Sequence, residues 1–338
     1  MLTRRRFAQT ACSMLALTAL PGTAPWAAAG GHGRVPRSYK GVKLGVITYS
    51  LMGNPGPMPP GFPSPPADML PPADRDPIDV IIERCIDVGA ANIELLNVYG
   101  ENPPPLVNGG RFGQVPDKST PEYLESRERL RQWRLAQPLD RYHQVREKFQ
   151  RAGLNLFSYV WTVADDDTPE EIDKGFQQLR ALGVRIFCTN QTRYTMAPKI
   201  IPFAEKYHIS PAWHPHDNTD DPREVATAQT LERLLDMSPE FRVNLDIGHF
   251  TAGNQDAVAF LEQHHARITH LHIKDRKRNH GPNVQLGTGE TPITACLHLL
   301  RDRKWPIYAL LEREYRGPGT AVEETRWQMQ YMKKVLDT

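Results

Sequence analysis

The strongest constraint on the fold is an alternation of strand-like and helix-like segments, which runs from residue 42 to the end of the chain. Such alternation is typical of a parallel sheet whose strands are joined by crossover helices. Short apolar runs predict strands at 43–49, 92–96, 154–160, 185–189, 209–213, 242–246, 268–273 and 307–312. Strands of this number, with helices between them, close a barrel, so the sequence predicts an α/β protein with a (β/α)8 TIM-barrel fold.

Helices are expected between the strands, for example at 77–88, 139–152, 169–182, 255–265 and 321–336. Several joints between a helix and the next strand contain a glycine, namely Gly89, Gly153 and Gly183. Glycine at such a joint ends a helix and releases the chain into the following strand. The glycines therefore support the same repeating unit.

The first 30 residues are interpreted as an export signal rather than as part of the fold. Arg4, Arg5 and Arg6 form a twin-arginine segment, a short apolar stretch follows, and alanines at 27–29 offer a cleavage site. The apolar stretch is too short to span a bilayer. We expect a signal at 1–30, a linker at 31–41 and a single barrel domain at 42–338, in a periplasmic or otherwise extracytoplasmic protein. An uncleaved N-terminal anchor is the alternative.

Two expected connections are much longer than usual, at 51–76 and 97–138. The first is dense in proline, which cannot join a strand ladder or a helix interior. The second begins with prolines and glycines and then becomes a charged, helical stretch at 121–135. Both follow strands and so belong to the catalytic face of a barrel. A lid or a wall of the substrate pocket is one interpretation, and a disordered excursion or an oligomer contact is the other.

Charge and cysteine content exclude some classes of protein. The formal net charge of +2 comes partly from the signal arginines, and no basic stripe indicates nucleic acid. The basic run at 274–278 is typical of a solvated rim, with an anion-binding role as the alternative. The cysteines that follow the signal are Cys85, Cys188 and Cys296. Their odd number and their positions in expected helices and strands predict buried free thiols.

Side chains that bind metals end the last four expected strands. The stretches are His214–Asp217, Asn244–His249, His270–Asp275 and Leu311–Glu314. Because all strands of a barrel end on one face, these side chains are expected to meet around one point. A mixed set of His, Asp and Glu suits a divalent ion such as Mn²⁺, Zn²⁺ or Mg²⁺. The sequence therefore predicts one divalent metal ion as cofactor.

Residues two apart in a strand share a face. The pairs that share one are His214 with His216, His270 with His272, and Glu312 with Glu314. Each pair is expected to supply one candidate ligand and one neighbour that supports the ligand, faces the substrate or is structural.

With these motifs the chain resembles the xylose-isomerase-like TIM-barrel family, the sugar phosphate isomerase/epimerase group, over roughly residues 42–337. The resemblance is carried by His214-Pro-His216, Leu245-Asp246-Ile-Gly-His249, His272-Ile-Lys274-Asp275, the loop Gly287-Thr-Gly289-Glu290, and Leu311-Glu312. It implies that the metal is held by His214, Asp246, His272 and Glu312. In isomerases of the family the first of these positions is usually a glutamate. The epimerases use two metal-bound glutamates as paired acid and base, so His214 puts that symmetric mechanism in question here.

The expected chemistry is removal of a proton from the carbon beside a metal-bound carbonyl. The candidates for proton transfer are Glu312, His216 and His249. Lys274 is expected to stabilise the oxyanion, with a salt bridge as the alternative. Glu94 is expected to accept a sugar hydroxyl or to pair with Lys274.

Two more residues, Asn190 and Glu314, are candidates for substrate contact. The glycine loop at 287–289 lacks the Lys-Ser/Thr of a phosphate-binding loop, and we expect it to shape one wall of the pocket.

The expected function is a metal-dependent isomerase or epimerase acting on a sugar or polyol. Because export disfavours phosphorylated intracellular substrates, a free sugar or keto-glycoside is the favoured partner. A lyase or dehydratase with the same metal site is the main alternative, and a non-catalytic sugar-binding protein is a further one. An endonuclease IV-type enzyme needs more metal ligands and a basic face, which this chain lacks. No nucleic-acid partner and no membrane span after signal removal are expected, and a homo-oligomer is left open.

Overall fold

The computed structural model describes residues 35–51, 74–96, 103–106, 117–190, 192–315 and 317–338. The expected export signal and most of the proline-rich connection at 51–76 lie outside the described residues.

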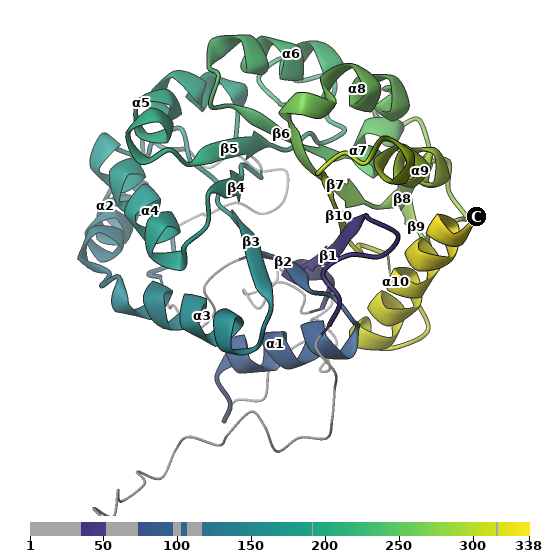
Figure 1. Ribbon diagram of the computed structural model, residues 1–338. Helices are drawn as coiled ribbons and strands as arrows, with labels where there is room; N and C mark the ends of the chain where they lie inside the picture. Colours follow the sequence, from purple (N-terminus) through teal and green to yellow (C-terminus); the bar gives the residue numbers. More distant parts are fainter. Residues whose placement is uncertain (1–34, 52–73, 97–102, 107–116, 191, 316) are drawn as a thin grey trace, which may run out of the picture. The chain divides into compact units, whose positions relative to one another are not determined.

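Eight parallel strands close into a barrel in the order β1-β10-β7-β6-β5-β4-β3-β2 (Figure 1), which confirms the predicted fold. The barrel strands are β1 Lys43–Ile47, β2 Asn92–Leu95, β3 Asn155–Val160, β4 Ile186–Cys188, β5 Ser210–Trp213, β6 Arg242–Asp246, β7 Ile268–Ile273 and β10 Tyr308–Leu311. A separate antiparallel pair, β8 Asp275–Arg276 and β9 Asn283–Val284, follows β7. The expected strands match the barrel strands with ends that differ by at most two residues.

Helices surround the barrel (Figure 1). They are α1 Pro77–Asp87, α2 Pro121–Ala136, α3 Asp140–Arg151, α4 Pro169–Leu182, α5 Ala197–Tyr207, α6 Ala228–Met237, α7 Ile247–Ala252, α8 Ala257–His264, α9 Ile293–Arg303 and α10 Ala321–Asp337. Short 3-10 turns lie at η2 Thr48–Ser50, η4 Tyr194–Met196 and η5 His265–Arg267. Within the part of the chain that the structure describes, no helix combines the length and hydrophobicity needed to cross a membrane.

The ends of the helices follow from local chemistry. Thr168 caps α4 through a capping box with Glu171, whose side chain accepts from the amide of Thr168. At the other end of α4, Gly183 adopts φ +76°, a conformation that favours glycine. The predicted glycine joints at Gly89 and Gly153 have the same left-handed backbone, with φ +73° at each. These joints are confirmed.

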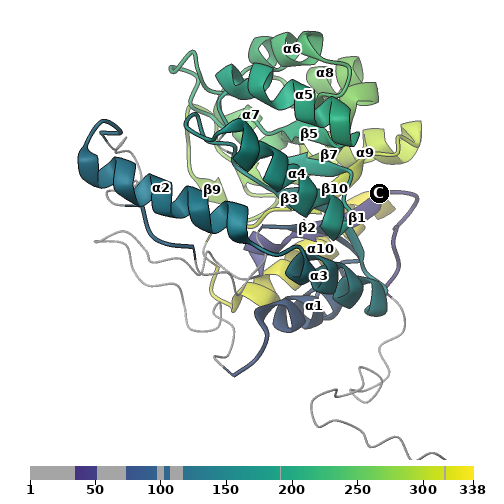
Figure 2. The same ribbon diagram turned by 90° about the vertical axis from the view of Figure 1, so that its left-hand side faces the viewer.

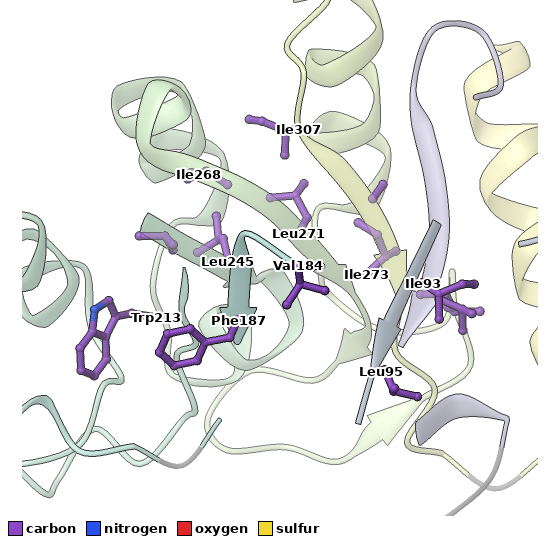
Figure 3. Packing of buried hydrophobic residues seen from close by; sticks show 14 of the residues in the cluster. Ile93, Leu95, Val184, Phe187, Trp213, Leu245, Ile268, Leu271, Ile273 and Ile307 are labelled. Atoms are coloured by element: carbon purple, nitrogen blue, oxygen red, sulfur yellow. The ribbon is translucent and has the colours of Figure 1, made fainter. Parts of the chain in front are cut away.

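Strand alternation divides the barrel into an apolar outside and a polar inside. Ile93 and Leu95 of β2 belong to the buried hydrophobic core (Figure 3), and Glu94 between them points the other way, into the barrel. Leu271 and Ile273 of β7 join the same core and leave His272 on the inner face. The pattern that packs the helices onto the strands therefore also sets polar side chains inside the barrel.

The three cysteines after the signal are buried and free, as predicted.

The charged stretch in the second long connection forms α2, which extends away from α3 and α4 in Figure 2. Its attachment to α4 is largely electrostatic. Arg127 lies 3.0 Å from Asp167 and 2.5 Å from Glu171, and the two carboxylates are almost fully buried. Arg134 makes a second contact with Asp167 at 2.6 Å. The lid and oligomer interpretations of the two long connections both stay predictions.

Candidate metal centre

The four residues expected to bind a metal, His214, Asp246, His272 and Glu312, lie together. One ligand atom from each lies within 4.8 Å of the others, and all four residues are buried. They come from the carboxyl ends of β5, β6, β7 and β10, which are consecutive around the barrel. Asp246 and His272 are register partners on neighbouring strands. The convergence thus follows directly from the closed parallel sheet.

The distances between the ligand atoms suit a shared ion. His272 Nδ1 lies 3.0 Å from Glu312 Oε2 and 3.1 Å from His214 Nε2. Asp246 Oδ2 lies 3.5 Å from His214 Nε2 and 3.9 Å from His272 Nδ1. Metal–ligand bonds of about 2.1 Å place neighbouring donor atoms about 3.0 to 3.5 Å apart. A divalent ion fits among these atoms.

Buried carboxylate oxygens in the cluster lack hydrogen-bond partners. Among the described residues, Asp246 Oδ2 and Glu312 Oε2 accept no hydrogen bond of normal geometry. Lys274 Nζ forms ion pairs with them, at 3.1 Å and 2.9 Å. Two ionised carboxylates around one ammonium keep a net negative charge in a buried place, and a bound divalent cation would neutralise it. The charge of the cluster therefore suits a metal site.

Asp246 is oriented by the helix that follows it. Its Oδ1 accepts a hydrogen bond from the backbone amide of His249 at 2.7 Å and caps α7. Burial favours the neutral acid, but Lys274, His249 and His214 outweigh burial and hold the pKa of Asp246 well below its usual value. Because Oδ1 of the ionised carboxylate is fixed by this hydrogen bond, Oδ2 is the oxygen that faces the cluster.

Charged neighbours also control His272 and Glu312. Although burial favours the neutral imidazole, Glu312 and Glu94 raise the pKa of His272 to about 10. Burial raises the pKa of Glu312, but Lys274 and His272 outweigh it and lower the pKa to about 2. A metal ion that binds His272 therefore has to displace a proton.

Lys274 is a buried ammonium among carboxylates. Besides Asp246 and Glu312, its Nζ lies 2.8 Å from Glu314 Oε2. Glu314 also accepts a hydrogen bond from Asn283 of β9 at 3.1 Å. The salt-bridge interpretation of Lys274 is thus observed. Its role toward an oxyanion and the contact of Glu314 with substrate stay predictions.

His216 and His249 lie beside the cluster and differ in their partners. Their rings are 4.8 Å apart, and the ring of His216 is also 4.8 Å from that of His214. His249 Nδ1 lies 2.7 Å from Arg276 and 3.1 Å from Asp217. His216 is partly exposed, and its ring has no hydrogen bond to any described residue. Burial and the neighbouring His214, His249 and Lys274 hold the pKa of His216 well below its usual value.

Arg276 corrects the solvated-rim interpretation of the basic run. Its side chain is buried and binds both carboxylate oxygens of Asp217, at 2.8 Å and 3.0 Å. It also donates to the carbonyl of Gly281 at 2.8 Å. A run of charges indicates solvent only when nothing packs over it, and here Asp217, His249 and the carbonyl of Gly281 contact the guanidinium.

The glycine loop has an internal partner. The amides of Gly287, Gly289 and Thr291 donate to the Asp275 carboxylate at 2.8 Å, 2.9 Å and 3.2 Å. Amides occupied in this way are not free to hold a phosphate, as expected, and the role of the loop as a wall of the pocket stays a prediction. A side chain at Gly289 would collide with Asp275, because its Cβ would lie 1.9 Å from a carboxylate oxygen.

Glu94 does not pair with Lys274, so that expectation is wrong. Its Oε1 lies 2.7 Å from His272 Nε2, and its Oε2 accepts a hydrogen bond from Ser158 at 2.7 Å. His270 Nε2 lies 3.0 Å from the same Oε2. Glu94 is completely buried, with both oxygens engaged by protein groups, an arrangement that does not favour contact with a sugar hydroxyl. The role of Ser158 as a hydrogen-bond donor to Glu94 could not be predicted, because a single serine in a strand has no distinguishing sequence pattern.

Asn190 lies just after β4, and the structure gives it no contact with the cluster. Its carbonyl accepts a hydrogen bond from Thr162 at 2.5 Å, and its Oδ1 is buried without a hydrogen-bond partner among the described residues. A substrate contact by Asn190 stays a prediction.

Comparison with known proteins adds a family and a set of similar folds. Residues 196–335, which contain all four residues of the cluster, match the family described as xylose isomerase-like TIM barrel. No match to a curated protein was found. A sugar phosphate isomerase/epimerase from Parabacteroides distasonis is 19% identical, with a TM-score of 0.55, over 93% of this chain and 98% of that one.

Two epimerases have similar structures. A 3-keto-D-glucoside 4-epimerase from E. coli is 12% identical, with a TM-score of 0.54, over 87% of this chain and 99% of that one. A D-psicose 3-epimerase from Clostridium cellulolyticum is 11% identical, with a TM-score of 0.56 and the same coverages of 87% and 99%. At these identities the likeness concerns the fold alone. Residues 196–335 thus match the xylose isomerase-like TIM barrel, and the closed eight-stranded barrel has the fold that this description names.

Proposed function

We propose that the protein is a divalent-metal-dependent isomerase or epimerase that acts on a sugar or polyol. The observation that carries the proposal is the buried cluster of His214, Asp246, His272 and Glu312 at the carboxyl end of the barrel. A divalent ion held there would bind a carbonyl oxygen and a neighbouring hydroxyl oxygen of the substrate. By polarising the carbonyl it would acidify the C–H of the carbon that bears the hydroxyl. The match of residues 196–335 to the xylose isomerase-like TIM barrel, and the similar fold of a sugar phosphate isomerase/epimerase, support the same chemistry.

The donor set favours particular ions. Two imidazole nitrogens and two carboxylate oxygens suit Mn²⁺ or Zn²⁺, whereas Mg²⁺ prefers oxygen ligands and retained water. We propose Mn²⁺ or Zn²⁺ as the working ion.

The protein's own side chains would move the proton. Glu312 is the first candidate for this transfer because its carboxylate is itself part of the cluster, 3.0 Å from His272 Nδ1. His216 is the better placed of the two neighbouring histidines, since its ring has no hydrogen bond to a described residue and the residue is partly exposed. His249 is held by Arg276 and Asp217, which suits a role in orienting the substrate.

Lys274 would hold the negative charge that develops on the substrate oxygen. Its ammonium lies within 3.1 Å of Asp246, Glu312 and Glu314, so it is fixed at the edge of the cluster before substrate binds. A preorganised cation of this kind stabilises an oxyanion without rearrangement.

Elimination by a lyase or dehydratase is the second candidate function. By resemblance, His214 replaces a glutamate that epimerases pair with the residue equivalent to Glu312, so a symmetric acid and base are missing. One carboxylate and one histidine still suffice to remove a proton and to protonate a leaving group.

The test is turnover in D2O with a panel of free sugars and keto-glycosides, before and after removal of metal by a chelator. Isomerisation or epimerisation gives a product isomer with deuterium at the reacting carbon. Elimination gives an unsaturated product and a released hydroxyl or alcohol. Sugar binding with no exchange on any substrate would identify a non-catalytic sugar-binding protein and defeat the proposal.

We further propose export of the protein by the twin-arginine route. Arg4, Arg5 and Arg6 followed by a short apolar stretch support export, and they favour a free sugar or keto-glycoside as substrate. Cell fractionation and sequencing of the mature N-terminus test it. Cytoplasmic protein that retains Met1 would contradict it.

A further inference from the structure

We infer that Glu94 is a positioning residue that fixes the ring of His272 so that Nδ1, and not Nε2, faces the metal centre. This inference rests on the proposed metal site. It assigns a function to a buried carboxylate that is not itself among the four residues of the cluster.

The first step is the position of the His272 ring between two carboxylates. Its Nδ1 lies 3.0 Å from Glu312, on the side of the cluster. Its Nε2 lies 2.7 Å from Glu94 Oε1, on the opposite side. Glu94 belongs to β2, and two strands, β1 and β10, separate β2 from β7 in the barrel. The contact therefore crosses the barrel interior instead of following the sheet.

The second step concerns which nitrogen of the His272 ring carries the proton. An ionised carboxylate only accepts hydrogen bonds, so Nε2 has to carry the proton that it donates to Glu94. A neutral imidazole protonated at Nε2 has its lone pair on Nδ1. That lone pair points at the atoms of His214 and Glu312 between which an ion would lie. Histidine ligands in proteins commonly donate their second N–H to a carboxylate in this way.

Asn244 completes the same arrangement. Its side-chain amide lies 3.1 Å from His272 Nε2 and 3.3 Å from the Cys188 sulfur. With Nδ2 toward both groups, the buried Oδ1 has no hydrogen-bond partner among the described residues. The reverse amide orientation, which has the same shape, lets Oδ1 accept from both the Nε2–H and the thiol. In that orientation the Nε2–H has a second acceptor beside Glu94, and Nδ2 takes the buried position that has no partner among the described residues.

The third step is the fixation of Glu94 itself. Its Oε2 accepts from Ser158, its register partner on β3, and lies 3.0 Å from His270 Nε2. Glu94, His270 and Ser158 are completely buried, so water does not compete for these contacts. A carboxylate fixed through Oε2 presents Oε1 to His272 and keeps the ring in one orientation before an ion arrives.

An alternative occupant has to be considered, because Glu94, His270 and His272 also lie close enough to hold an ion of their own. That second ion would bind His272 Nε2 and so remove the proton that Glu94 accepts. One ring would then have to serve two metals as an imidazolate. The hydrogen bond from Ser158 to Glu94 favours the positioning role over this second site.

The experiment compares metal binding by the wild type, Glu94→Gln and a matched control, Glu171→Gln. Glu171 is also a buried carboxylate, but its partner is Arg127 on α2, outside the metal centre. Metal-free protein is titrated with Zn²⁺ against a chelator of known affinity, and the absorption spectrum of the Co²⁺ form is recorded. Thermal unfolding of each metal-free variant reports any purely structural loss.

We expect Glu94→Gln to raise the Kd for Zn²⁺ by about 10- to 100-fold and to change the Co²⁺ spectrum. Glu171→Gln is expected to lower thermal stability without changing the Kd more than about twofold. Wild-type affinity and an unchanged Co²⁺ spectrum in Glu94→Gln would overturn the inference, as would two ions per wild-type chain. Failure of the wild type to bind any ion would instead overturn the proposed function.

A measurement on the wild type covers the case in which Glu94→Gln does not fold. Nitrogen-15 NMR of the Zn²⁺-loaded protein, with the His272 signal assigned by its loss in His272→Gln, distinguishes a ring bound through Nδ1 from one bound through Nε2. Zinc on Nδ1 with a proton on Nε2 is the expected state. Zinc on Nε2 would overturn the inference.

Discussion

The backbone amide of His249 donates a 2.7 Å hydrogen bond to Asp246 Oδ1, so one carboxylate both caps α7 and offers its second oxygen to the metal centre. Asp246→Asn keeps an oxygen for the cap but loses the charge, whereas Asp246→Ala loses both. We expect both variants to lose bound metal. We expect the alanine variant to be less stable than the asparagine variant by about 1 kcal/mol, the usual value of a cap.

Elemental analysis and urea unfolding measure the two effects of the Asp246 variants separately. Full metal occupancy in either variant would remove Asp246 from the ligand set. Equal unfolding free energies would show that the cap contributes little to α7.

His216 is predicted to act in proton transfer without holding metal. His216→Ala should keep its full metal content and lose turnover and solvent proton exchange by about 100-fold or more, the scale of general acid–base catalysis. His143→Ala, an exposed histidine on α3, is the matched control and should behave as the wild type. Loss of metal in His216→Ala would instead make His216 a ligand.

Lys274 is predicted to stabilise the metal-free protein by neutralising the carboxylates around it. Lys274→Met leaves Asp246 and Glu312 without their ammonium, and loss of one partner from a buried ion pair costs about 3 to 5 kcal/mol. A bound divalent ion supplies the missing positive charge. We therefore expect Zn²⁺ to raise the Tm of the variant by more than it raises the Tm of the wild type.

The control for Lys274 is Lys206→Met. The Lys206 side chain is 58% exposed and its Nζ pairs with Asp173 at 2.6 Å, and such surface pairs contribute little. Calorimetry with and without Zn²⁺ measures each Tm. An equal rise in Lys274→Met and the wild type would contradict the prediction.

Acid sensitivity is predicted at Asp76, which caps α1 and ties it to α3. Burial raises its pKa, but hydrogen bonds from Arg141, at 2.9 Å, and Lys148, at 2.8 Å, outweigh burial and hold the pKa well below the usual 3.8. The folded form therefore binds the proton less readily than the unfolded form. Its stabilising effect is present in full above the ordinary carboxyl pKa and is lost as the pH falls below it.

Asp76→Asn keeps a side-chain oxygen for the cap and removes the charge. We expect the variant to be less stable than the wild type at pH 7, with a difference that shrinks between pH 4 and pH 2 as the wild-type carboxyl is protonated, about the range in which such linkage acts. Urea unfolding at each pH measures the difference. A constant difference across that range would show that the charge of Asp76 contributes nothing.

Much of this architecture could be predicted from the sequence because strands and metal ligands have local signals. The apolar run that ends at Leu245 predicts β6, and any parallel barrel brings Asp246 and His272 to the same face. The contact of Glu94 with His272 has no such signal, since 178 positions separate them and the contact depends on the barrel diameter. The burial of Arg276 was missed for a similar reason, because hydropathy reports the residue and not what packs over it.

Asp275 anchors the glycine loop without taking part in the metal centre. Lys274 and Asp275 are consecutive, yet one contacts the metal centre and the other fixes the loop through the amides of Gly287 and Gly289. Residues 277–286 thus leave from and return to fixed points beside the centre. We therefore expect that exchanging this segment changes the surroundings of the metal centre and leaves the metal ligands where they are.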